Sequence, residues 1–138
     1  MNKSKALVLG TVLCSLMLAA VQLAAHHSFA AQYDRNKQAT LTGPVTKIDW
    51  INPHARFFMD VKDEKTGKVV NWEVELSAPA MLMRRGWTKA AVPVGKPVTV
   101  NGSLAKDGSN LINASTVTLA DGKRVFAGSS GDPDSGTP

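Results

Sequence analysis

Two neighbouring segments of the chain alternate strictly between apolar and polar residues. In residues 55–62 and 69–76 every second side chain is apolar, which is the periodicity of a strand with one face on a hydrophobic core. The six residues between them, DEKTGK, carry a late glycine that suits a hairpin turn. The pattern therefore predicts two antiparallel strands joined by a short loop.

A single register satisfies both faces of this hairpin. With Val61 opposite Val70 the two apolar faces coincide, whereas a slip of one residue would turn one of them to water. The same register sets Arg56 opposite Glu75 on the outer face. That outer face is expected to carry Arg56, Phe58, Asp60, Asn71, Glu73 and Glu75.

The segments on either side complete an all-β pattern with one short helix. Residues 39–52 are rich in β-formers but are interrupted by Gly43-Pro44, which predicts a bulge or a sharp bend. Residues 96–105 predict a fourth strand, and residues 112–128 predict a fifth with a short extension past the turn at Asp121-Gly122.

The helix is expected between the third and fourth strands. Ser77 is placed to cap it, Pro79 fits its first turn, and Gly86 suits the left-handed position past its end. Met81 and Met83 lie two apart and so point to different sides, which we expect to be the core and its rim.

This order of elements favours a small five-stranded OB-type barrel, in which the helix fills the gap between strands three and four. A small open β-sandwich is the alternative fold.

The first 25 residues have the composition of a cleaved signal peptide. A short basic start is followed by an apolar run that ends in small residues, with cleavage expected after Ala25 or, as the second choice, after Ala24. We therefore expect a periplasmic or secreted protein with no stable membrane anchor after cleavage. The remaining chain divides into an N-terminal arm (26–37), one folded domain (38–126) and a disordered tail rich in Gly, Ser and Pro (127–138).

The charge and the cysteine content argue against nucleic-acid binding and against cysteine chemistry. Removing residues 1–25 takes away Lys3 and Lys5, so the formal charge falls from +5 to +3. It also removes Cys14, the only cysteine, which leaves neither disulfides nor thiolate ligands. A mildly basic exported chain with acids on the outer hairpin face is not expected to bind nucleic acid.

Several motifs resemble a family of small exported bacterial proteins whose domain has no known function. They are HHSFAAQYD, VTKIDWINPHARFFMDV, NWEVELSAP, LMRRGW and GSLAKDGSNLINASTVTLADGKRVFAG, which together cover nearly all of the chain between signal and tail. The resemblance implies an exported single domain and no particular activity, ligand or site.

The leading functional hypothesis is a metal site at the new N-terminus. Cleavage after Ala25 gives a chain that begins with His26, whose free amine and imidazole can chelate one metal ion. The imidazole of His27 or of His54 would complete a nitrogen-rich set of the kind that Cu(II) favours. Cleavage after Ala24 also leaves a copper-competent terminus, with histidine in third place. The competing interpretation is that His26 and His27 belong to a solvated arm and that His54 orients a turn.

The alternative function is a module that binds a small ligand or a periplasmic protein through the outer hairpin face. Its expected residues are Trp50, Arg56, Phe58, Asn71, Glu73 and Glu75. In this case an ion pair between Arg56 and Glu75 on a solvated face is the competing interpretation.

No arrangement of residues predicts an enzyme. The mature chain has no cysteine nucleophile, and its serines lie in caps, turns and tail. A metal-dependent oxidase that uses the His26 terminus is the low-ranking alternative.

Overall fold

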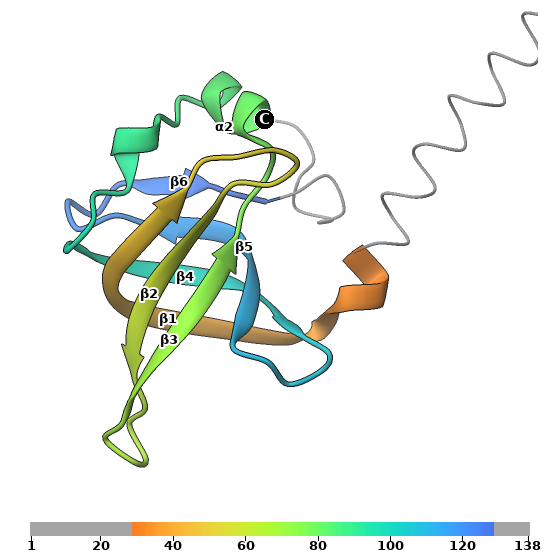
Figure 1. Ribbon diagram of the computed structural model, residues 1–138, viewed down its shortest axis with the longest axis vertical. Helices are drawn as coiled ribbons and strands as arrows, with labels where there is room; N and C mark the ends of the chain where they lie inside the picture. The colour runs from red at the N-terminus through yellow and green to blue at the C-terminus, as the bar shows by residue number, and fades with distance from the viewer. Residues whose placement is uncertain (1–28, 129–138) are drawn as a thin grey trace, which may run out of the picture.

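The structure is a computed structural model that describes residues 29–128 (Figure 1). Residues 29–32 are helical and lead directly into the first strand. The further elements are β1 (Tyr33–Asp49), β2 (Arg56–Lys62), β3 (Val69–Glu75), α2 (Pro79–Arg84), the 3-10 helix η1 (Lys89–Ala91), β4 (Pro97–Ala105), β5 (Leu111–Thr118) and β6 (Arg124–Phe126).

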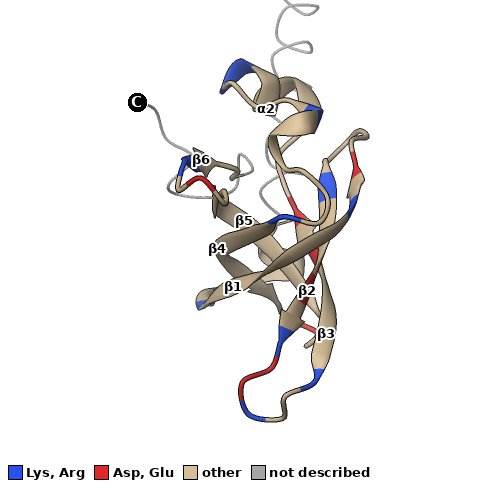
Figure 2. Cartoon of the chain, turned by 90° about the vertical axis from the view of Figure 1, so that its left-hand side faces the viewer, with Lys and Arg blue, Asp and Glu red and all other residues tan. Residues whose placement is uncertain are grey.

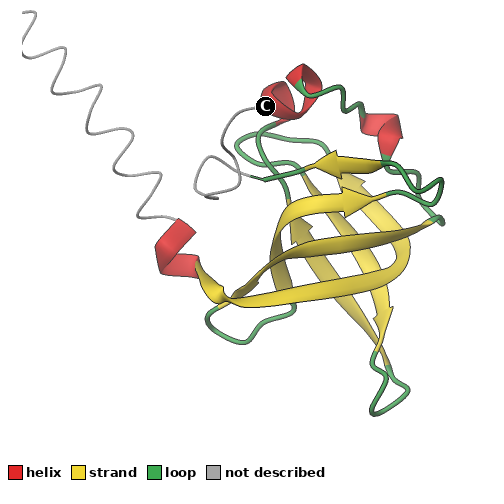
Figure 3. Ribbon diagram, turned by 180° about the vertical axis from the view of Figure 1, so that it is seen from behind, coloured by secondary structure: helices red, strands yellow, loops and turns green. Residues whose placement is uncertain are grey.

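The strands form one sheet in the order β3-β2-β1-β4-β5-β6, and all of these neighbours run antiparallel. β3 also pairs with β5 in parallel, with Glu75 opposite Asn113. Helices α2 and η1 lie outside the strands, at the end away from the β2–β3 turn (Figure 3). The predicted fold class is thus confirmed at the level of a mostly antiparallel sheet with only short helices.

β1 is 17 residues long and serves two neighbours. It pairs with β4 as far as Pro44 and with β2 from Val45 onward, and the register with β2 shifts between Val45 and Lys47. Glycine is required at Gly43, because a Cβ atom there would lie 1.9 Å from the backbone oxygen of Asp60. The predicted bend at Gly43-Pro44 is confirmed, and it lets β1 curve around the molecule (Figure 1).

The predicted register of the hairpin is confirmed along its whole length. Val61 lies opposite Val70 and Arg56 lies opposite Glu75. The inner-face residues Phe57, Met59 and Val74 are completely buried. Because both faces of the two strands demand the same pairing, alternation alone was sufficient to determine it.

The segment between β3 and β4 covers the core at one end of the sheet. Leu82 of α2 and Trp87, which follows the helix, are both buried in the main hydrophobic cluster. The indole N–H of Trp87 donates to the backbone oxygen of Phe126 at 3.0 Å, which ties this segment to β6. The helix therefore closes the core at the place in the chain where the sequence predicts it.

Two details of the helix differ from expectation. Its N-cap is Ala78, and no side chain caps it. Ser77 instead continues the strand pairing, because its N–H donates to Ala127 and its carbonyl accepts from Ala55. Met81 and Met83 are both exposed, because Pro79 and Leu82 are the residues that α2 buries.

The ordered chain extends past both expected boundaries of the domain. β1 begins at Tyr33, within the segment expected to be an arm. Ala127 is completely buried and accepts a hydrogen bond from Ser77, within the segment expected to be a tail. The expected signal peptide and residues 129–138 lie outside the described residues. None of the helices within residues 29–128 has the length and apolar character needed to cross a membrane.

Candidate functional site

A buried carboxylate, Glu75, is the centre of a polar cluster on the outer face of the sheet. The β2–β3 register brings Arg56 beside it, and the parallel β3–β5 pairing brings Asn113 to its other side. His54 lies two residues before the start of β2. The side chain of Glu75 is only 6% exposed, although it belongs to the face opposite the main core.

Three side chains bond to the two carboxylate oxygens of Glu75. His54 Nδ1 lies 2.9 Å from Oε1, and Asn113 Nδ2 donates to the same oxygen at 3.1 Å. Arg56 donates to Oε2 at 3.4 Å. Burying a carboxylate without such partners would cost a large desolvation free energy. These bonds offset that cost for Glu75.

The protonation equilibria follow from this geometry. The hydrogen bond to Glu75 raises the pKa of His54, although partial burial opposes the rise. Burial alone would raise the pKa of Glu75, but the bond and charge of His54, together with the charge of Arg56, outweigh it and hold that pKa below its ordinary value. The pair therefore favours an imidazolium beside a carboxylate.

Tyr33 adds a buried hydroxyl to the cluster. Burial, and then the negative charge of Glu75, raise the pKa of Tyr33, so the group remains a neutral phenol. Its hydroxyl lies close enough to Glu75 for the two groups to shift each other's pKa, although within residues 29–128 no contact of this hydroxyl has the geometry of a full hydrogen bond. The ring of Phe29 packs on Tyr33 with their centroids 5.3 Å apart. The beginning of the described chain is thus attached to the same face as Glu75.

His54 is oriented by its bond to Glu75. With Nδ1 held by the carboxylate, Nε2 is the nitrogen that remains for another partner, and no described residue bonds to it. The side chain is 39% exposed. A histidine whose second nitrogen is held by a carboxylate is the common arrangement of metal ligands. Within residues 29–128, however, no group of three His, Cys, Asp or Glu residues could hold a metal ion.

The other two histidines of the metal hypothesis, His26 and His27, lie outside the described residues. The structure therefore describes His54 alone of the three expected ligands.

The outer hairpin face is a set of mutually bonded groups. Arg56 forms an ion pair with Glu73 at 2.7 Å in addition to its contact with Glu75. Asn71 donates to Asp60 at 2.7 Å. These polar groups are satisfied by one another.

The two aromatic residues expected on this ligand face occupy different environments. The ammonium group of Lys47 lies 5.2 Å from the centroid of the Phe58 ring and covers it. Trp50 is half-buried and packs against the hydrophobic core. Trp50 therefore packs on the core, unlike the other residues of the expected ligand face.

Comparisons with known proteins address the family and not the site. A family of unknown function, DUF6152, matches residues 13–113. The chain belongs to this family. The suspected membership of an uncharacterised family is therefore confirmed, and the family's description assigns no activity.

The search of curated proteins gives no match. Among solved structures the chain is similar to one in the crystal structure of yeast Stn1 and Ten1, with 13% identity and a TM-score of 0.40. That alignment covers 60% of this chain, and the chain spans 42% of the length of its match.

Sequence reasoning missed Tyr33 and Asn113 as members of the cluster. Asn113 stands between two buried residues of β5, Ile112 and Ala114, and is itself buried. A polar residue inside so apolar a strand was the available signal, but its partner depends on the parallel β3–β5 pairing. Tyr33 gave no signal, because its surroundings in the sequence show no alternation.

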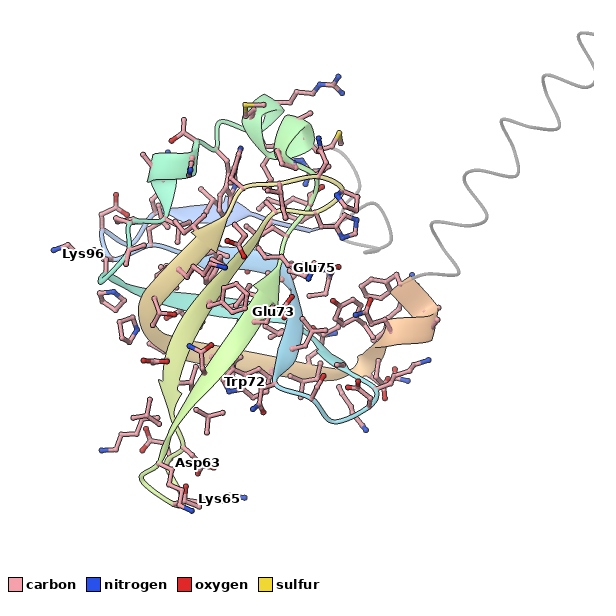
Figure 4. All side chains as sticks on the ribbon, in the orientation of Figure 1. Asp63, Lys65, Trp72, Glu73, Glu75 and Lys96 are labelled. Atoms are coloured by element: carbon pink, nitrogen blue, oxygen red, sulfur yellow. The ribbon has the colours of Figure 1, made fainter. Side chains whose placement is uncertain are left out.

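A separate shallow cavity of about 450 Å³ lies toward the tip of the β2–β3 hairpin. Its lining includes Trp72 and, from the hairpin turn, Asp63 and Lys65, which lie far from Glu75 in Figure 4. Its remaining lining residues are Thr40, Leu41, Val61, Lys62, Glu64, Val70 and Asn110.

Proposed function

We propose that this protein is a small exported binding protein that holds a transition-metal ion, copper first. The amine and imidazole of His26 are the primary ligands, and His27 and His54 supply further imidazoles. The proposal includes cleavage of residues 1–25 and a periplasmic or secreted location. Nitrogen-rich sets of this kind suit Cu(II), and the amine and imidazoles lose their protons to a metal around neutral pH.

The observation that carries the proposal is the bond between His54 and Glu75. A buried carboxylate that is fixed by Arg56 and Asn113 holds Nδ1 of His54, and this leaves Nε2 for a metal. The bond fixes the ring orientation and makes the imidazole a better ligand.

The attachment of Phe29 also supports the proposal. Phe29 stands three residues after His26, and three extended residues span about 11 Å at most. Its ring packs on Tyr33, which is buried beside Glu75. Phe29 therefore lies on the face that carries His54, which supports a site shared between His54 and the N-terminal ligands.

We further infer that the sheet closes as the five-stranded OB-type barrel expected from the sequence. The support is the parallel pairing of β3 with β5, added to the antiparallel order β3-β2-β1-β4-β5. We expect no nucleic-acid partner, because Arg56 on the outer face is already paired with Glu73 and Glu75. The same pairing counts against the alternative of a ligand module on that face.

Two measurements test the proposed metal site. The intact mass of the protein purified from the cells that export it gives the start of the chain, which we expect to be His26 or Ala25. Titration with Cu(II) should then give one tight site that weakens strongly in His26→Ala. A chain that starts at Ala31 or keeps its signal contradicts the proposal, as does micromolar binding that survives His26→Ala.

A matched pair of variants tests the contribution of Glu75. Glu75→Gln should weaken copper binding about ten- to a hundredfold, because an amide orients and polarises His54 less well. Glu73→Gln makes the same chemical change on the same face, but Glu73 contacts Arg56 and not His54. Equal copper affinities of these two variants would remove His54 from the proposed ligand set.

A further inference from the structure

The chain from α2 to β4 carries a surface whose cations have no acidic neighbours in sequence. Residues 76–106 contain Arg84, Arg85, Lys89, Lys96 and Lys106 and not one Asp or Glu. In Figure 2 helix α2 shows basic residues and no acidic ones, whereas the β2–β3 turn shows both. The cations of this segment are therefore not balanced by acids of the same segment.

Three of these cations are exposed and form no ion pair within residues 29–128. They are Arg84, Lys89 and Lys96. Arg84 contacts only the sulfur of Met81, at 3.8 Å. Lys96 points away from the strands in Figure 4. Arg85 differs, because its guanidinium lies 4.3 Å over the ring of Phe126 and so has an intramolecular role.

Two large apolar side chains are exposed in the same segment as these cations. Met83 is 57% exposed and Val94 is 59% exposed. Both belong to the segment that runs along the outside of the strands from α2 to β4 (Figures 1 and 3). We call the five residues Arg84, Lys89, Lys96, Met83 and Val94 the basic surface.

We propose that the basic surface binds reversibly to a lipid bilayer that carries anionic headgroups. Charge complementarity selects an anionic partner, since none of the three cations forms an ion pair with a described acid. Exposed apolar side chains near cations suit the boundary between headgroups and acyl chains. There the apolar groups are buried from water and the cations contact anionic headgroups. Association of this kind needs no covalent anchor and no membrane-spanning helix. It is independent of the proposed copper site, because the basic surface contains no histidine.

Vesicle binding of the purified protein tests this inference. Binding to phosphatidylcholine vesicles with 30 mol% phosphatidylglycerol is compared with binding to pure phosphatidylcholine. The ratio of the two affinities removes any contribution that apolar segments make to both. Each cation near an anionic surface should raise the affinity about fivefold. The triple variant Arg84→Gln, Lys89→Gln, Lys96→Gln should therefore lower this ratio about a hundredfold. The double variant Met83→Ser, Val94→Ser keeps the charge and should weaken binding to the anionic vesicles about tenfold.

The matched control removes the same charge from the opposite end of the molecule. Lys62→Gln, Lys65→Gln, Lys68→Gln alters three exposed lysines around the β2–β3 turn and should leave the ratio within about threefold. Thermal unfolding of every variant verifies that the domain is folded. Equal binding of the native protein to both vesicles would overturn the proposal and favour an acidic protein surface as partner. Equal losses in the two triple variants would also overturn it, since only net charge would then matter.

Discussion

The outer face of β2 and β3 and the segment from α2 to β4 handle positive charge in opposite ways. On the strands, Arg56 is shared between Glu73 and Glu75 at 2.7 Å and 3.4 Å. On the segment, Lys89 and Lys96 form no ion pair with any described residue. The first region uses charge within the fold, and the second presents it to the surroundings.

The difference shows where charge contributes to stability and where it is available to a partner. The Glu75 carboxylate is buried, so its partners are needed to offset desolvation. Exposed cations in high dielectric lose little when they are removed. Mutations in the first region should therefore change the free energy of unfolding, and mutations in the second should change binding.

Replacing Glu75 with alanine should have the largest effect. The change leaves Arg56, Asn113 and His54 without their shared acceptor. Because Arg56 and His54 are partly exposed and only Asn113 is left buried, the loss should be about 1–3 kcal/mol. The free energy of unfolding in urea, measured on the metal-free protein, gives the loss directly. Glu64→Ala in the exposed hairpin turn is the control and should stay within about 0.5 kcal/mol. Similar losses in both variants would mean that Glu75 is no more structural than a surface acid.

The pair of His54 and Glu75 should make stability depend on pH. Because the pKa of His54 is raised from 6.5, its contribution is complete below that value and is lost as the pH rises through the folded pKa. Because the pKa of Glu75 is lowered from 4.5, its contribution is complete above that value and is lost as the pH falls through the folded pKa. Stability from this pair is therefore greatest between pH 4.5 and 6.5.

The magnitude should be modest, because His54 is partly exposed. Relative to His54→Gln, the metal-free native protein should lose about 0.5–1 kcal/mol of stability between pH 5.5 and pH 8.5. Because burial raises the pKa of Tyr33, this phenol stays neutral across the range and does not contribute to the change. Urea unfolding at the two pH values is sufficient to measure it. An identical pH dependence in His54→Gln would assign the effect to other groups.

The sequence predicted the outer hairpin face more completely than the cluster that the face supports. Alternation with period two is a local property, and both faces of the hairpin impose the same register, so the pairing of Arg56 with Glu75 followed from pattern alone. The contact of Asn113 with Glu75 joins residues 38 positions apart. It depends on a parallel pairing between β3 and β5 that no local periodicity specifies.

The N-terminal side of the cluster was missed for a different reason. Tyr33 begins β1, but residues 33–37 lack an apolar alternation and fall within the segment expected to be an arm. This part of β1 is held by backbone pairing with β4 and by the packing of Phe29 on Tyr33. The prediction that Ser77 caps the helix was wrong for a similar reason. Ser77 suits a helix cap, but its N–H pairs with the backbone of Ala127 instead. Local propensity gave way to tertiary contacts in both places.

Within the outer face, the ion pair of Arg56 with Glu73 should contribute less than the buried contacts. A double-mutant cycle with Arg56→Leu and Glu73→Gln should give a coupling energy of about 0.2–1 kcal/mol, since both side chains are partly exposed. Equilibrium unfolding of the four proteins provides the measurement. A cycle of Glu73→Gln with Lys89→Gln is the control and should give no coupling, because no ion pair joins these residues. A coupling above about 2 kcal/mol would place Glu73 among the buried contacts instead.

The smallest effects on stability should come from the basic surface. Arg84→Gln, Lys89→Gln and Lys96→Gln should each change the free energy of unfolding by less than about 0.5 kcal/mol, because no ion pair is lost. Arg85→Gln is the informative comparison in the same segment. Its guanidinium covers the ring of Phe126 and donates to Gly128, so its loss should cost about 0.5–1 kcal/mol. Equal costs at Arg84 and Arg85, measured by urea unfolding, would mean that the basic surface stabilises the fold and is not reserved for a partner.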